Sequence, residues 1–191
     1  HGIVGRTADE IALAITSFAL YGFPESHAAS FALIAYASAY LKAHHPEAFL
    51  CALLNAWPMG FYHPATLVKD AERHGVEVLP IDVTRSDWRC TIERREPAPG
   101  ARRRLRVSVR LGLRFVRGLR EEAGRRIVTA RAERSFLGPG DLAARASLLE
   151  RELSSLAELG ALGRIAGSRR AASWQVRGLA TSREPLFSGM E

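Results

Sequence analysis

The hydrophobic residues of this chain change their spacing twice, and this change limits the folds that it can adopt. Up to about residue 73 the apolar positions recur at helical spacing. Three short segments then alternate apolar and polar residues, as strands do: Val76–Leu79, Trp88–Ile92 and Leu105–Leu111. The last two can pair across residues 96–101. From Gly112 onward the helical pattern returns, so the sequence predicts a mainly α fold with a small β region between two modules.

Proline and glycine set the predicted helix boundaries in the first half. Gly22 and Pro24 break the chain, and Pro46 ends or bends a helix. Pro64 suits a first helical turn, and Gly75 stops that helix. The predicted helices run from Thr7 to about Leu20, from Glu25 or Ser26 to His44, from Pro46 onward, and from Ala65 to Arg73.

The charge is divided unevenly along the chain. Residues 1–93 carry 6 basic and 10 acidic residues, a net charge of −4, whereas residues 94–191 carry 21 basic and 10 acidic residues, a net charge of +11. Residues 94–134 alone hold 14 arginines and 4 acids. Clustered cations displace counterions from a phosphate backbone, so the second half of the chain has a charge that favours binding to nucleic acid. The alternative is a solvated surface in an arginine-rich proteome, since the chain has 25 Arg and only 2 Lys.

Other features exclude several classes of protein. Cys51 and Cys90 form no CxxC pair and are too few for a disulfide framework, so both are predicted to be small core residues in a reducing compartment. The longest uncharged run, Ala28–Leu41, is too short to span a bilayer and is predicted to be a core helix. No glycine-rich phosphate loop, dinucleotide fingerprint or zinc spacing occurs. We expect no membrane association and no metal site in these residues.

One stretch carries a resemblance to a known family. Residues 21–36 read Tyr-Gly-Phe-Pro-Glu-Ser-His-Ala-Ala-Ser-Phe-Ala-Leu-Ile-Ala-Tyr, and residues 41–49 read Leu-Lys-Ala-His-His-Pro-Glu-Ala-Phe. They resemble the fingers region of the bacterial C-family DNA polymerases, the polymerase III alpha-subunit family. Glu25 and Phe31 stand where replicative members have Lys and Tyr, which is similar to the error-prone, damage-tolerant branch. Asn55–Tyr62, Arg73–Val76 and Arg117–Glu121 follow in the order of that branch.

The resemblance implies a nucleotide contact at the start of the second helix. In the family this segment lies against the incoming nucleotide, so Ser26 and His27 are expected at the triphosphate and Phe31 at the nascent base pair. A helix N-terminus suits this role because its unpaired N–H groups and its dipole favour anions. The alternative is that Ser26 only caps the helix while His27 packs over the loop.

A second motif lies in the basic half. Residues 113–127 place Gly118 between apolar residues and ahead of a helix, which resembles the helix-hairpin-helix element of the same family. There the hairpin N–H groups approach duplex phosphates without reading bases, because glycine permits close approach. The usual second hairpin glycine is Arg120 here, so an arginine–phosphate contact is expected to replace it. The predicted DNA-binding residues are Arg117, Gly118, Leu119, Arg120 and Arg125.

Residues 147–162 and 168–174 resemble the degenerate second half of the same module. Arg169 and Arg170 begin its last helix and are expected to be solvated rather than secondary phosphate contacts. Trp174 is expected to pack.

The resemblance implies four parts: residues 1–93 end a polymerase fingers domain, residues 94–111 form a β connection, residues 112–178 form a helix-hairpin-helix DNA-binding module, and residues 179–191 are a linker or tail. The whole would be an error-prone DNA-directed DNA polymerase, a nucleotidyltransferase of translesion synthesis and DNA repair in the bacterial cytoplasm. Its magnesium-binding palm carboxylates belong upstream of His1, so no catalytic residue or cofactor is expected here, and the fragment alone should be inactive.

Partners follow from the same resemblance. We expect primer–template duplex DNA and a deoxynucleoside triphosphate, with a sliding clamp and other damage-response proteins as further partners. The alternative from another class is a stand-alone, noncatalytic DNA-binding module.

Overall fold

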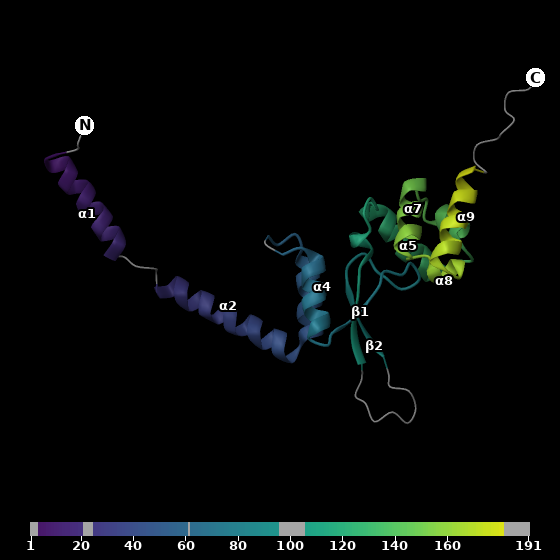
Figure 1. Ribbon diagram of the computed structural model, residues 1–191, viewed down its shortest axis with the longest axis horizontal. Coiled ribbons are helices and arrows are strands. Elements are labelled where there is room, and N and C mark those ends of the chain that lie inside the picture. Colours follow the sequence, from purple (N-terminus) through teal and green to yellow (C-terminus); the bar gives the residue numbers. More distant parts are fainter. Residues whose placement is uncertain (1–3, 21–24, 61, 96–105, 182–191) are drawn as a thin grey trace, which may run out of the picture. The chain divides into compact units, whose positions relative to one another are not determined.

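The computed structural model describes residues 4–20, 25–60, 62–95 and 106–181 (Figure 1). These residues fall into two units, residues 1–45 and residues 46–191. Helices dominate both units, and a three-stranded sheet lies in the second. The predicted mainly α fold with a small β region is therefore confirmed.

The first unit consists of α1 (Arg6–Leu20) and α2 (Glu25–His44), which agree with the predicted bounds to within one residue. The prediction of a core helix at residues 28–41 is wrong for this chain. Every side chain of that run is exposed except Ser38, which is half-buried, and Phe31 is 57% exposed. The physical reason is that α2 carries apolar side chains on all sides, so its burial requires packing partners around its whole circumference. The other described helix of this unit, α1, does not supply it.

The second unit begins with two helices, α3 (Pro46–Ala56) and α4 (Pro64–Arg73). Both start at proline, whose fixed φ suits a first helical turn. At α4 the His63 ring nitrogen accepts the Ala65 N–H at 3.2 Å and caps the helix. Gly75, with φ of +85°, ends the helix in the left-handed conformation that glycine adopts readily. These are the boundaries predicted from the sequence.

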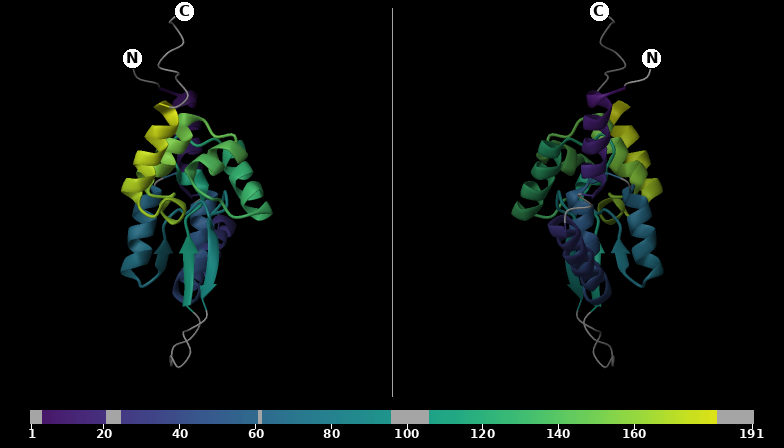
Figure 2. Two further views of the ribbon diagram at one scale, coloured as in Figure 1. Left: turned by 90° about the vertical axis from the view of Figure 1, so that its right-hand side faces the viewer. Right: turned by 90° about the vertical axis from the view of Figure 1, so that its left-hand side faces the viewer.

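The sheet follows in the order β1–β3–β2, formed by Glu77–Leu79, Arg106–Arg110 and Thr91–Arg95. The central β3 runs parallel to β1 and antiparallel to β2, and the antiparallel pair is visible in Figure 2. The expected pairing of the last two strands is confirmed, although their connection lies outside the described residues. The strand expected at Trp88–Ile92 begins only at Thr91. Before it, the backbone of Cys90 bonds to the side chain of Asn55, which donates to Cys90 O at 2.9 Å and accepts from Cys90 N at 2.8 Å.

Helices α3 and α4 cover this sheet and share a small core with it. Its buried members are Leu50, Cys51, Leu54, Val76, Cys90 and Val109. The two cysteines are therefore core residues, as predicted. Burial raises the pKa of the Cys90 thiol to about 11, despite the Gly112 N–H bond that lowers it, so this thiol stays protonated.

The polar face of β3 is buried rather than solvated. Arg110 is 3% exposed, donates to both oxygens of Glu93 and donates to Pro80 O. Ser108 donates to Glu77 at 2.5 Å. Because each buried polar group has a partner, the strand can occupy the centre of the sheet.

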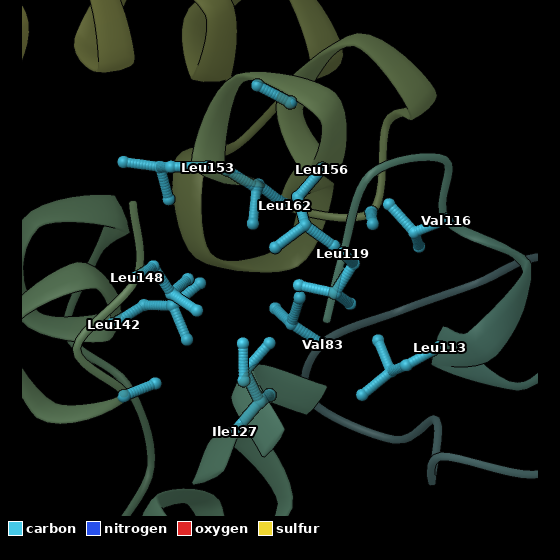
Figure 3. Close-up of a cluster of buried hydrophobic side chains, with 14 of the residues drawn as sticks. Val83, Leu113, Val116, Leu119, Ile127, Leu142, Leu148, Leu153, Leu156 and Leu162 are labelled. Carbon is cyan, nitrogen blue, oxygen red and sulfur yellow. The ribbon is translucent and has the colours of Figure 1, made fainter. Parts of the chain in front are cut away.

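The remaining elements are helical and enclose a second, larger core. They are η1 (Leu113–Phe115), α5 (Glu121–Glu133), α6 (Pro139–Arg145), α7 (Glu150–Leu159), α8 (Gly163–Ala166) and α9 (Arg169–Thr181). Figure 3 shows side chains from separate segments meeting in this core, among them Leu113, Ile127, Leu142 and Leu156, all 0% exposed. Helix α9 packs against α6, α7 and α8. Across the described residues, no helix has the length and apolar character needed to cross a bilayer.

Candidate nucleic-acid interface

The hairpin between η1 and α5 is anchored by the buried side chains on both sides of its tip. Val116 and Leu119 are 3% and 8% exposed and point into the core (Figure 3), whereas Arg117 and Gly118 between them are exposed. Leu119 N donates to Val116 O at 3.2 Å and closes the turn. Gly118 has φ of +80°, and no atom lies within 4 Å of the place that a methyl group would occupy on its Cα. The turn therefore presents an open backbone edge to solvent.

Two N–H groups at this edge are available to a ligand. None of the described residues accepts a hydrogen bond from the backbone N–H of Arg117 or Gly118. Successive unpaired N–H groups beside a guanidinium form a small cationic surface that suits a phosphate. Leu119 is also a predicted DNA contact, but its side chain lies in the core, so it can contribute only through its backbone.

Most arginines near the hairpin hold the fold together. Their partners are backbone carbonyls and carboxylates: Arg114 binds Asn55 and Trp57, Arg126 binds Ala146 and Ser147, Arg131 binds Val83, Ser86 and Asp87, and Arg134 binds Asp141. Among the described arginine side chains from Arg110 to Arg134, only Arg117 has neither an ion pair nor a hydrogen bond. The basic composition of this segment is thus mainly structural, and Arg117 stands out from it.

Arg120 is engaged by a buried carboxylate. Its Nε and Nη2 donate to the two oxygens of Glu152 at 2.8 Å and 3.2 Å, and its backbone N–H reaches Oε1 at 3.3 Å. Glu152 is 0% exposed, and its Oε2 also accepts the Leu149 N–H at 2.9 Å, at the start of α7. One carboxylate therefore ties the hairpin to α7. In this arrangement the Arg120 guanidinium, a predicted phosphate contact, is directed to Glu152.

The pKa of Glu152 reflects this environment. Burial on its own raises the pKa, but the hydrogen bonds from the Arg120 side chain and from the backbone N–H groups of Leu149 and Arg120 lower it to about 2. The carboxyl is therefore ionised at neutral pH, and both partners of the ion pair are charged.

Arg125 lies one turn into α5 and pairs with Glu121 at 2.6 Å. Both side chains are largely exposed, so this surface pair is weak and can exchange for another anion. Arg125 remains a predicted phosphate contact, although it must first exchange its ion pair with Glu121, which Arg117 need not do.

A second hairpin joins α7 to α8. Gly160 has φ of +84°, and Gly163 donates to Gly160 O at 3.1 Å. The stem of Arg169 lies over this turn, since a methyl group at Gly160 would be 3.7 Å from its Cδ. Arg169 and Arg170 are exposed, which fits both a solvated role and a phosphate contact. The expectation that Trp174 packs is wrong: it is 65% exposed, because Ala172 and Val176 face the core in its place.

The residues expected at the nucleotide lie at the start of α2 in the first unit. This helix begins at Glu25, so Ser26 and His27 occupy its first turn. The His27 and Phe31 rings meet edge to face, with centroids 4.4 Å apart. Both residues are exposed. The Ser26 side chain lies outside the described part, and the nucleotide contact stays a prediction.

Two features of the second unit were missed by sequence reasoning. Glu152 lies at the third position of α7, where a capping carboxylate is expected, but the residue before the helix is Leu149 rather than Ser or Thr. The exposed Trp174 follows two arginines on a helix that has no acidic residue, a pattern visible in the sequence. In the described residues, no group of three or more His, Cys, Asp or Glu side chains is placed to hold a metal ion.

Comparison with known proteins adds independent information. The family model described as "Helix-hairpin-helix motif" matches residues 75–172. The error-prone DNA polymerase of Azoarcus sp. (strain BH72) is 58% identical over 172 residues, 90% of this chain and 16% of the relative. The proteins of that name from Pseudomonas savastanoi pv. phaseolicola and Alkalilimnicola ehrlichii are 51% and 52% identical over 100% of this chain. The chain spans 18% of the length of each of these two.

Proposed function

This chain belongs to the helix-hairpin-helix motif family, and we propose that it acts as a segment of an error-prone DNA polymerase in which the hairpin at residues 116–120 holds the phosphate backbone of duplex DNA. The observation that carries the proposal is the exposed edge of the hairpin. There the N–H groups of Arg117 and Gly118 lack acceptors among the described residues, and the Arg117 guanidinium has no partner among them.

The chemistry of this edge favours backbone contact over base reading. Backbone N–H groups and a single guanidinium recognise phosphate oxygens, which are the same for every sequence. The described hairpin offers no Asn or Gln that could pair with a base edge, and Leu119 is buried. Binding should therefore be indifferent to sequence and sensitive to salt.

The order of elements along the chain agrees with that expected after the catalytic domain of such a polymerase. We place the end of the fingers in α1 to α4, the β connection in β1 to β3 and the DNA-binding module from η1 to the end of α9, because the boundaries expected at residues 93 and 178 fall inside β2 and α9. Ser26, His27 and Phe31 would contact the incoming nucleotide, and the exposed apolar side chains around α2 would be covered by the rest of the polymerase. Translesion synthesis is the proposed setting, by analogy with the error-prone relatives.

Magnesium would be held elsewhere in the protein. Several carboxylates of the described residues are paired with arginines, as Glu93 is with Arg110, and no three of these side chains are grouped to hold a metal ion. The residues of this chain would therefore position DNA and nucleotide, and the magnesium ions would stabilise the transferred phosphate from other parts of the enzyme.

The test is direct binding by the 191-residue chain. Fluorescence anisotropy should show binding to two unrelated duplexes with the same affinity, falling as salt rises. Failure to bind either duplex at low salt, with circular dichroism showing a folded chain, would reject the proposal. A strong preference for one duplex would also contradict it.

A further inference from the structure

The outward face of α9 carries a basic and aromatic surface that the hairpin proposal does not use. A shallow depression of about 530 Å³ on this face is lined by Arg169, Arg170, Ser173, Trp174 and Arg177. These positions repeat at three to four residues, so they form one stripe along the helix. From the first to the last the stripe extends over about 12 Å. We call it the α9 stripe.

Packing explains why the stripe faces solvent. The opposite side of α9 is buried through Ala172, 0% exposed, and Val176, 4% exposed, which join the larger core. Helix α9 lies beside α7 and α8 (Figure 1), and among the described residues its outward face is left uncovered. Trp174 is 65% exposed on that face, more than either Trp57 or Trp88, which are half-buried. The indole is therefore a surface group rather than part of the core.

The charge of the stripe favours an anionic partner. Helix α9 has no acidic residue, and two arginines lie in its first turn, where the helix dipole already supplies positive charge. This placement is locally unfavourable for the helix. Local unfavourable choices of this kind are typical of binding sites. The Ala171 N–H is already capped by Ser168 Oγ at 3.1 Å, so the guanidinium groups, rather than this part of the helix end, are what the stripe offers a ligand.

The exposed indole of Trp174 distinguishes between two anionic ligands, duplex and single-stranded nucleic acid. In a duplex the faces of the bases are stacked on one another, so a side chain on the surface of a protein helix cannot stack on them. Unpaired bases have free faces and stack on aromatic side chains irrespective of sequence, while nearby arginines hold the intervening phosphates. The charge also favours nucleic acid: the stripe holds three arginines on a helix without an acidic residue, which matches a uniformly anionic phosphate backbone better than a protein surface of mixed charge.

From this combination we infer that the α9 stripe binds single-stranded DNA, with an unpaired base stacked on Trp174 and the adjoining phosphates held by Arg169 and Arg170. The surface is separate in residues and in ligand from the duplex-binding hairpin. Its start lies against the second hairpin, where the Arg169 stem covers Gly160. In a polymerase segment such a surface would suit an unpaired strand next to the bound duplex.

The experiment uses the 191-residue chain and three labelled probes: a short oligothymidylate, the same oligomer with abasic sites, and a duplex. Trp174→Ala should weaken oligothymidylate binding by roughly 5- to 150-fold, the range expected when one base loses its stacking partner. It should leave binding to the abasic oligomer and the duplex unchanged. Trp174→Phe should retain most of the affinity, because it keeps a stacking face. Leu159→Ala, another exposed apolar residue at 53%, is the matched control.

Arginine variants and fluorescence complete the test. Arg169→Ala with Arg170→Ala should weaken binding to both single-stranded oligomers and flatten the salt slope by roughly 0.7 for each phosphate that is no longer neutralised. Oligothymidylate should quench tryptophan fluorescence in the wild-type chain but not in Trp174→Phe. Equal binding of Trp174→Ala and wild type to oligothymidylate would overturn the inference, and so would an equal weakening with the abasic probe. If the wild-type chain bound oligothymidylate but not the duplex, the hairpin proposal would be rejected and this inference would stand.

Discussion

The Arg120 guanidinium and the buried Glu152 carboxylate form a two-point ion pair, with Nε and Nη2 at 2.8 Å and 3.2 Å from the two carboxylate oxygens. The pair joins the first hairpin to α7, and its two residues are 32 positions apart in the sequence. It also removes one arginine from the surface that is predicted to contact DNA. Composition alone therefore overstates the number of arginines available for binding.

Glu152→Gln should destabilise the chain by about 3 kcal/mol near neutral pH. The amide keeps the shape of the side chain but loses the charge that the Arg120 guanidinium and two backbone N–H groups stabilise. Urea denaturation measures the change in the free energy of unfolding. Glu158→Gln, on the exposed side of the same helix, removes the same charge and should change stability little. A fully stable Glu152→Gln variant would show that the ion pair does not hold the hairpin.

The contribution of Glu152 should disappear in acid. Its pKa of about 2 in the folded chain lies below the ordinary value of 4.5, so the unfolded chain takes up the proton at higher pH. The stabilisation is then complete above pH 4.5 and is lost as the pH falls toward 2. The difference in unfolding free energy between wild type and Glu152→Gln should shrink between about pH 5 and about pH 3. A constant difference over this range would contradict the low pKa.

Arg120→Ala should lower the thermal midpoint much more than Arg117→Ala, although both remove one arginine from the same hairpin. The first variant leaves the buried Glu152 without its charged partner, whereas Arg117 has no partner to lose among the described residues. Combining Arg120→Ala with Glu152→Gln should cost less stability than the sum of the two single substitutions, because both remove the same ion pair. Additive effects of the two substitutions would mean that the ion pair contributes nothing to stability.

Gly118→Ala should cost about 1–2 kcal/mol of stability, because a residue with a Cβ is strained at φ of +80° even in open space. It should also weaken duplex binding, since the methyl group lies on the edge that approaches the phosphate. Gly163→Ala is the control: its site is also open but has no positive φ. If Gly118→Ala were as stable as wild type and bound DNA as tightly, the tight turn would not be needed for binding.

In the full-length polymerase that we propose, His27→Ala should raise the nucleotide KM or lower kcat/KM while leaving DNA affinity and the thermal midpoint near wild type. His27 is exposed at the first turn of α2, so its removal should not disturb a core. Steady-state incorporation kinetics give the two constants. A fall in activity matched by a fall in stability would favour a structural role for this histidine.

Much of the fold can be predicted because local residues determine it. Pro46, Pro64 and Gly75 set helix boundaries, and Gly118 marks the hairpin. The start of β2 differs from the predicted one because Asn55, 35 residues away, takes the backbone bonds of Cys90. Arg131 likewise binds the Val83 carbonyl 48 residues away, which no local pattern reveals. The hairpin motif can therefore be located from the sequence, but its arginines can be assigned roles only from tertiary structure.

Salt dependence of duplex binding by Arg117→Ala tests the central claim most directly. If Arg117 holds a phosphate, the variant should bind all duplexes more weakly, and the slope of log K against log salt should flatten by roughly 0.9. Arg73→Ala, an exposed arginine on α4, lowers the net charge equally and should leave the slope unchanged. A folded Arg117→Ala variant with the wild-type slope would contradict duplex binding at this hairpin.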